Sequence, residues 1–224
     1  MPPVFGARTM NKVTPENYQE LAMRTAKPLD KKDNLIHMAL GITSEVGELA
    51  GELSQFQYTM DNITAEVDPG SQDQKVWEKK CIREAGDIFW FVALGCETIG
   101  VQFKDLPGYA SRLDNEGLKL KTVLFYTVHS EYSVEALAAL AGEVGTLVKR
   151  HVVMEQPLDE KALHATLALL ASGLALFCEH NLGATTDAIL EENIFKLQDK
   201  FAGRYPDVTF SIDKAMARND EKVH

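Results

Sequence analysis

Apolar residues recur at steps of three and four along most of the chain between Glu16 and Lys200, and alternation at every second residue is rare. Steps of this size place apolar side chains on one face of an α-helix. We therefore expect an all-α fold. The predicted helices span residues 15–27, 34–56, 76–99, 103–121, 133–151, 160–181 and 185–200.

Two of these helices show how they would be buried. The helix at 76–99 is apolar on every side between Ile88 and Cys96, which is typical of a helix at the centre of a bundle. The sequence Asp68-Pro69-Gly70 breaks the helical pattern before it. The helix at 34–56 instead carries one apolar stripe, formed by Leu35, Ala39, Ile42, Val46, Leu49, Leu53 and Phe56.

The chain contains a weak internal repeat. Residues 140–150 (LAGEVGTLVKR) resemble residues 41–53 (GITSEVGELAGEL), and each segment is followed by a long apolar helix that ends near a glycine, Gly183 or Gly100. Two helical hairpins of this kind predict an internal pseudo-dimer, in which each hairpin buries its apolar face against the other as in a four-helix bundle. Chance similarity between helices rich in alanine and leucine is the alternative explanation. The repeat divides the chain into residues 1–128 and 129–224.

Four carboxylates stand out on the two long helices of the first repeat. Glu45 and Glu48 are three residues apart, as are Glu84 and Asp87, so each pair projects from one face of its helix. A rotation of about 100° per residue places each pair beside the apolar stripe. Four carboxylates at a shared seam cannot all stay ionised without a partner, because burial of uncompensated charge is costly.

A hard divalent cation would resolve this accumulation of charge. Mg²⁺ prefers carboxylate oxygens and takes its remaining ligands from water and substrate phosphates, and Mn²⁺ can substitute for it. In such a site the metal binds a polyphosphate and lowers the pKa of a bound water, while one carboxylate serves as general base. The alternative is a solvated row of glutamates, because glutamate is a strong helix former.

Net charge and composition limit the kinds of molecule that this protein is expected to bind and the compartment in which it is expected to work. The formal net charge of −10 argues against binding to nucleic acid, whose phosphates require Lys and Arg, but it is compatible with a small phosphorylated ligand held through metal ions. Three cysteines without a Cys-x-x-Cys pair fit neither a disulfide framework nor a zinc ribbon. The N-terminus lacks a long apolar leader, and we expect no membrane span and a cytoplasmic location.

The acidic motifs resemble those of the MazG-like, all-α nucleoside triphosphate pyrophosphatases, a family that includes dimeric dUTPases and dCTPases. Residues 44–48 (SEVGE) and 84–91 (EAGDIFWF) are similar to the family's E-x-x-E and E-x-x-D motifs, although Ser44 stands where many members have a further Glu. The resemblance implies Mg²⁺-dependent hydrolysis of (deoxy)nucleoside triphosphates to a nucleoside monophosphate and pyrophosphate. The metal ligands and catalytic residues that it implies are Glu45, Glu48, Glu84 and Asp87.

The resemblance extends to positions that would contact the nucleotide. Residues 193–207 (NIFKLQDKFAGRYPD) are similar to the family's N-x-x-K-L and R-Y-P motifs, which implies that Asn193, Lys196 and Arg204 face the substrate. Trp90 belongs to the second acidic motif and would stack on a base. A buried position in the core is the alternative for this tryptophan, because its helix is so apolar.

The second repeat lacks the acidic pattern. A match of the two EVG segments places Glu143 opposite Glu45 and Thr146 opposite Glu48. A match of Gly183 to Gly100 places Leu167 and Leu170 opposite Glu84 and Asp87. We therefore expect one intact metal site in residues 1–128 and none in residues 129–224.

Two other functional classes remain open. One is a non-catalytic nucleotide-binding or scaffold bundle, and the other is a hydrolase of the same fold that acts on another phosphorylated nucleotide. A homo-oligomer of the pseudo-dimeric chain is also left open, and base and sugar preference do not follow from the sequence.

Overall fold

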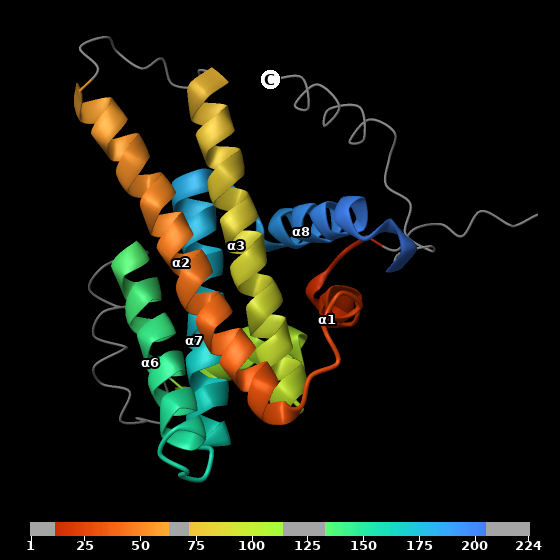
Figure 1. Ribbon diagram of the computed structural model, residues 1–224. Helices are drawn as coiled ribbons and strands as arrows, with labels where there is room; N and C mark the ends of the chain where they lie inside the picture. The colour runs from red at the N-terminus through yellow and green to blue at the C-terminus, as the bar shows by residue number, and fades with distance from the viewer. Residues whose placement is uncertain (1–11, 63–71, 114–132, 205–224) are drawn as a thin grey trace, which may run out of the picture.

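The computed structural model of the protein describes residues 12–62, 72–113 and 133–204, and within these ranges every regular element is a helix and no strand occurs (Figure 1). The expected all-α fold is confirmed. The α-helices are α1 (Pro15–Met23), α2 (Lys31–Asn62), α3 (Gln72–Ile99), α4 (Leu106–Leu113), α6 (Val134–Val152), α7 (Glu160–Leu182) and α8 (Thr186–Lys200). Short 3₁₀ helices occupy Phe103–Asp105 and Ala202–Arg204.

Capping side chains set several of the helix starts. The side chains of Ser133, Asp159 and Thr185 accept hydrogen bonds from the backbone N–H groups three residues later, which satisfies donors that the first helical turn leaves unpaired. Gly100 and Gly183 adopt left-handed backbone conformations directly after α3 and α7, where glycine ends a helix without strain. The start of α6 and the ends of α7 and α8 therefore lie within one residue of their predicted positions.

Local chemistry explains where the first helices differ from prediction. The helix α1 ends at Met23 and continues as a tight turn, because Lys27 precedes Pro28 and a residue before proline is disfavoured in a helix. Asp30 then starts α2 three residues earlier than predicted, since its carboxylate accepts a hydrogen bond of 2.8 Å from the N–H of Asp33. The predicted helix at 103–121 is replaced by a 3₁₀ turn and α4, and residues 114–121 lie outside the described residues.

Four long helices form the body of the molecule (Figure 1). The helix α2 packs on α3 and α6, and α7 packs on α3 and α6. The helix α4 lies on α7, and α8 lies across α3 with α1 beside both. Fully buried apolar side chains from all four long helices fill the interior, among them Leu35, Ile42, Ile88, Val92, Leu140, Val144, Leu167 and Leu170.

A glycine allows three of these helices to meet closely. A Cβ atom at Gly95 would lie 2.5 Å from Met38 Sδ and 2.9 Å from Leu167 Cδ1, which is too close for a real side chain. The absence of a side chain on α3 therefore lets α2 and α7 approach it from two sides.

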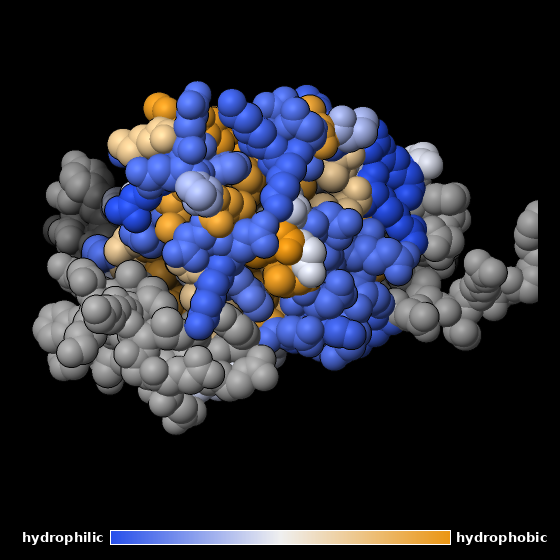
Figure 2. Space-filling view, turned by 90° about the horizontal axis from the view of Figure 1, so that it is seen from below, coloured by the Kyte–Doolittle hydropathy of each residue, from blue (hydrophilic) through white to orange (hydrophobic). Residues whose placement is uncertain are grey.

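The helix α7 is the described helix that is long and apolar enough to cross a membrane by length and composition, a property that the sequence analysis expected of no segment. In its most apolar 18-residue stretch, 61% is buried inside the protein, against α3, α4 and α6. Its apolar composition is accounted for by its central place in the bundle. Seen from below, the surface is mostly hydrophilic, with apolar side chains showing between polar ones (Figure 2).

Candidate metal centre

Three of the four predicted acidic residues come together between α2 and α3. One carboxylate oxygen from each of Glu45, Glu84 and Asp87 lies within 4.8 Å of the other two, and all three side chains are half-buried. Elsewhere in the described ranges no other group of His, Cys, Asp or Glu side chains meets this criterion. We call Glu45, Glu84 and Asp87 the carboxylate triad.

The pattern of buried positions places the triad where the two helices meet. Each acid directly precedes a core residue, since Val46, Ala85 and Ile88 are at most 2% exposed. Neighbouring positions on a helix are rotated by about 100°, so the acids lie at the edge of the α2–α3 interface and not in its centre. This is the position beside the apolar stripe that the sequence predicts.

Burial and mutual repulsion leave the triad with unbalanced negative charge. Burial raises the pKa of Glu45 to about 7, and the charges of Asp87, Glu48 and Glu84 act in the same direction. The pKa of Glu84 is also raised, first by burial and then by Asp87. The ammonium of Lys196 opposes both shifts without cancelling them. A cation of higher charge would fit this set of oxygen donors.

The helix α8 brings a cation and an amide to the triad. Lys196 forms an ion pair with Asp87 Oδ2, and Asn193 Nδ2 donates a hydrogen bond of 3.1 Å to Asp87 Oδ1. Both residues are more than a hundred positions away from Asp87 in the sequence. Two of the residues that the family resemblance predicts at the substrate therefore contact Asp87 of the triad directly.

Close packing of α8 on α3 depends on Gly86. A Cβ atom at Gly86 would lie 2.9 Å from Asn193 Cβ, so a side chain there would push α8 away from the triad. A longer contact of 3.8 Å joins Arg83 Nε to Glu192 Oε1 one turn away. The glycine of the second acidic motif therefore sets the distance between Asn193 and Asp87.

The fourth predicted acid lies outside the triad. Glu48 is exposed on α2, one turn beyond Glu45, and its Oε1 accepts a hydrogen bond of 3.4 Å from Ser44 Oγ. Its charge nevertheless helps to raise the pKa of both Glu45 and Glu84. Glu48 therefore borders the site and does not form part of its centre.

Two other predicted residues contact the end of α1. Trp90 Nε1 donates hydrogen bonds of 3.0 Å to both Ala22 O and Thr25 Oγ1, and the indole ring packs edge-on against His37 and Phe91. Trp90 thus fastens α1 to α3. Arg204 is exposed, donates a hydrogen bond of 2.8 Å to Arg24 O, and holds its guanidinium 6.0 Å from the centre of the Phe201 ring.

The corresponding positions of the second repeat offer no carboxylate cluster within the described residues. Leu167 and Leu170 are fully buried in the core. Thr146 Oγ1 donates a hydrogen bond of 2.9 Å to Gly142 O of its own helix, and Glu143 is half-buried.

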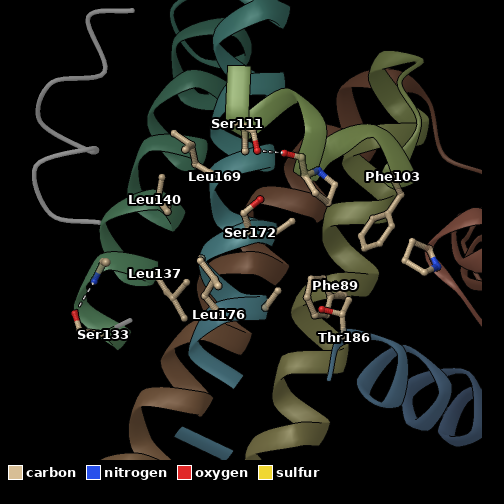
Figure 3. A pocket seen from close by; sticks show the side chains of 17 residues that line it. Phe89, Phe103, Ser111, Ser133, Leu137, Leu140, Leu169, Ser172, Leu176 and Thr186 are labelled. Atoms are coloured by element: carbon tan, nitrogen blue, oxygen red, sulfur yellow. Dashed lines mark hydrogen bonds between the residues drawn. The ribbon is translucent and has the colours of Figure 1, made fainter. Parts of the chain in front are cut away.

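A separate cavity of about 500 Å³ lies among α3, α4, α6 and α7 (Figure 3). Its described lining is apolar with a few hydroxyl groups, including Ser172, and contains no titratable side chain. Phe89 lines this cavity, whereas Asp87 two positions earlier points to the other side of α3. This cavity therefore offers no acidic or basic side chain of its described lining for acid–base or metal chemistry, and the triad lies outside it.

One residue beside the triad was not anticipated. Tyr18 of α1 is fully buried, and its hydroxyl donates a hydrogen bond of 2.8 Å to Asn193 Oδ1. The two residues are 175 positions apart, and no motif in the sequence links them.

Comparison with known proteins gives no independent assignment, since no family model, no curated protein and no solved structure matches the chain. Over the residues that the structure describes, fold and site define an all-helical bundle with a candidate carboxylate metal centre between two antiparallel helices.

Proposed function

We propose that this protein is a Mg²⁺-dependent nucleoside triphosphate pyrophosphohydrolase that produces a nucleoside monophosphate and pyrophosphate, with Mn²⁺ able to replace Mg²⁺. The observation that carries the proposal is the carboxylate triad with Lys196 and Asn193 held on Asp87. The likeness of residues 44–48 and 84–91 to the MazG-like motifs selects this activity among those that a carboxylate metal centre supports.

The chemistry of the donor set fits a hard divalent cation. The triad supplies three carboxylate oxygens, the type of ligand that Mg²⁺ prefers. The raised pKa values of Glu45 and Glu84 reflect negative charge that Lys196 alone does not neutralise. Glu45, Glu84 and Asp87 would hold the metal, with Glu48 bordering them.

Bound Mg²⁺ would neutralise the polyphosphate and assist ionisation of the attacking water. Side chains of the protein would bind the phosphates and accept the proton. The ammonium of Lys196, which pairs with Asp87 in the structure, is placed to pair with a phosphate oxygen when the triad is neutralised. Glu48 lies outside the triad and is the carboxylate we assign to accept a proton from the attacking water.

We also propose that the chain is an internal pseudo-dimer with one active site. Reciprocal packing supports this arrangement: α4 follows α3 and packs on α7, while α8 follows α7 and packs on α3. The offset that aligns Gly183 with Gly100 aligns Asn193 with Ala110 of α4. In this account α8 completes the metal site of the first repeat, and α4 takes the corresponding place on the second repeat without the polar groups.

A substrate panel tests the proposed function. The full chain is incubated with canonical and modified nucleoside triphosphates, nucleoside diphosphates and dinucleotides, and pyrophosphate and phosphate are measured separately. We expect pyrophosphate from triphosphates, loss of activity in chelator and recovery on addition of Mg²⁺ or Mn²⁺. Turnover restricted to another nucleotide class would assign a different hydrolase, and tight nucleotide binding without turnover would assign a non-catalytic module.

A further inference from the structure

A chain of hydrogen bonds runs from the buried face of α1 to the carboxylate triad. Tyr18 on α1 donates to Asn193 Oδ1 at 2.8 Å, and Asn193 Nδ2 on α8 donates to Asp87 Oδ1 at 3.1 Å. Tyr18 is fully buried and Asn193 is 2% exposed, so water does not compete for these groups. The three residues come from three separate helices.

The direction of each hydrogen bond follows from the charge of Asp87. An ionised carboxylate only accepts hydrogen bonds, so the side chain of Asn193 must turn its NH₂ group toward Asp87. The amide oxygen of Asn193 then faces Tyr18, whose hydroxyl must donate. Gly86 O is a second acceptor near this hydroxyl, but it is more distant at 3.4 Å. Only one orientation of the amide satisfies all three side chains.

The packing around Tyr18 fixes the position of its hydroxyl. The tyrosine ring lies 5.1 Å from the ring of Phe103, measured between centroids, in a tilted arrangement. The backbone of Gly86 and the side chain of Asn193 close the other end, with Asn193 Cβ in the space that a side chain on Gly86 would occupy. The hydroxyl therefore has little freedom to leave Asn193.

We propose that Tyr18 is a positioning residue for the metal site, acting through Asn193 to hold the Asp87 carboxylate toward Glu45 and Glu84. The inference rests on the proposed function, because it assigns the oriented carboxylate to metal binding. Asp87 also carries the ion pair with Lys196 on its other oxygen, so Asn193 restrains the carboxylate when Lys196 turns to a phosphate. Loss of the tyrosine hydroxyl would leave the amide of Asn193 free to rotate and the carboxylate less well oriented.

The test measures Mn²⁺ affinity of the full chain without nucleotide, by calorimetry and by the electron paramagnetic resonance signal of free Mn²⁺. Tyr18→Phe keeps the ring and removes only the hydroxyl. We expect it to weaken Mn²⁺ binding about threefold to tenfold, the range for loss of one hydrogen bond. Asn193→Ala should weaken binding at least as much, and Tyr18→Phe should have no further effect in the Asn193→Ala background.

The matched control is Gln19→Met, at the next position of α1. Gln19 is buried, donates 2.8 Å to Glu97 Oε2 and accepts 2.8 Å from the N–H of Phe103, so its loss loosens α1 without touching Asn193. We expect Gln19→Met to lower the Tm while Mn²⁺ affinity stays within about twofold of wild type. If Tyr18 acted only by stabilising α1, Tyr18→Phe and Gln19→Met would weaken Mn²⁺ binding by the same factor, and the positioning role would be wrong.

These measurements distinguish failure of the proposed function from failure of the positioning role of Tyr18. If wild type has no Mn²⁺ site that Asp87→Asn removes, the proposed function fails and the role of Tyr18 fails with it. If that site exists but Tyr18→Phe binds Mn²⁺ as wild type does, or still acts in the Asn193→Ala background, the positioning role is wrong and the proposed function stands.

Discussion

Glu45 is the residue whose ionisation the site perturbs most clearly. Its pKa is raised from 4.5 to about 7, first by burial and then by the neighbouring carboxylates. A carboxyl group with a raised pKa binds a proton more tightly in the folded than in the unfolded state, so the free energy of unfolding falls as the pH rises. The loss should develop between about pH 4.5 and about pH 7 and level off above that range.

A pH series of thermal melts measures this effect in metal-free protein. Because Glu45 is only half-buried, solvent screening reduces the contribution to about 1 kcal/mol, or roughly 2–4 °C in Tm. Glu45→Gln should remove this part of the pH dependence and melt above wild type at pH 8. Addition of Mg²⁺ at pH 8 should raise the Tm of wild type more than that of the variant. If the Tm of wild type and of Glu45→Gln changed with pH in the same way, ionisation of Glu45 would not destabilise the folded protein.

Lys196 is the cation that pairs with Asp87 of the triad and opposes the rise in the pKa of Glu45. If it pairs with substrate phosphate, Lys196→Ala should raise KM about tenfold with a smaller change in kcat, since a charge-assisted contact is lost. Lys200→Ala is the control, because Lys200 lies one turn further along α8, is exposed and contacts Phe201. Steady-state kinetics at low ionic strength check the prediction. Equal KM values for the two variants would limit α8 to a structural role.

At the scale of elements, the α3–α8 contact determines whether the site is complete. A methyl group at Gly86 would lie 2.9 Å from Asn193 Cβ, and relief of this clash requires α8 to move away from Asp87. Gly86→Ala should therefore cost about 1–3 kcal/mol of stability and reduce turnover along with it.

Gly142→Ala is the matched control for this substitution. Gly142 also lies within a helix, but a Cβ atom there would meet nothing within 4 Å. This variant should gain about 0.5–1 kcal/mol from the higher helix propensity of alanine and keep full activity. Thermal melts and turnover of both variants provide the comparison, and a stabilised, active Gly86→Ala protein would mean that α8 is not tightly docked.

The elements show what could be predicted from the sequence. Helix type followed from the three- and four-residue spacing of apolar positions, and the ends of α3 and α7 followed from Gly100 and Gly183. The early start of α2 was missed because the predicted start rested on the apolar stripe, which begins at Leu35, whereas Asp30 caps the helix before it. Short-range capping of this kind decides helix boundaries but leaves the apolar spacing unchanged.

The candidate site was predictable only in part. Positions beside the apolar stripes placed Glu45, Glu84 and Asp87 at one helix interface, because helical geometry fixes the direction of side chains. The same spacing treats Glu48 as equivalent, but its side chain is exposed and lies outside the triad. Tyr18 was not predictable, since its role depends on how α1 docks between α3 and α8.

At the scale of the whole molecule, the two helical hairpins depend on each other. The helix α2 packs on α6 and α3 packs on α7, with Gly95 of α3 in close contact with Leu167. Residues 1–128 alone would expose this apolar face and would lack Asn193 and Lys196. We expect the fragment to self-associate or precipitate and to show no turnover, as checked by size-exclusion chromatography and activity assay. A monomeric, fully active fragment would refute the pseudo-dimer.

The proposed function requires that the carboxylate triad hydrolyses nucleoside triphosphates between the α- and β-phosphates. Phosphorus NMR of one Mg²⁺-containing reaction, run in parallel with wild type, Asp87→Asn and Glu143→Gln, tests it most directly. We predict nucleoside monophosphate and pyrophosphate with wild type and Glu143→Gln, and a rate at least ~100-fold lower with folded Asp87→Asn. Inorganic phosphate and a nucleoside diphosphate as first products, or equal rates with Asp87→Asn, would rule out this reaction at the triad.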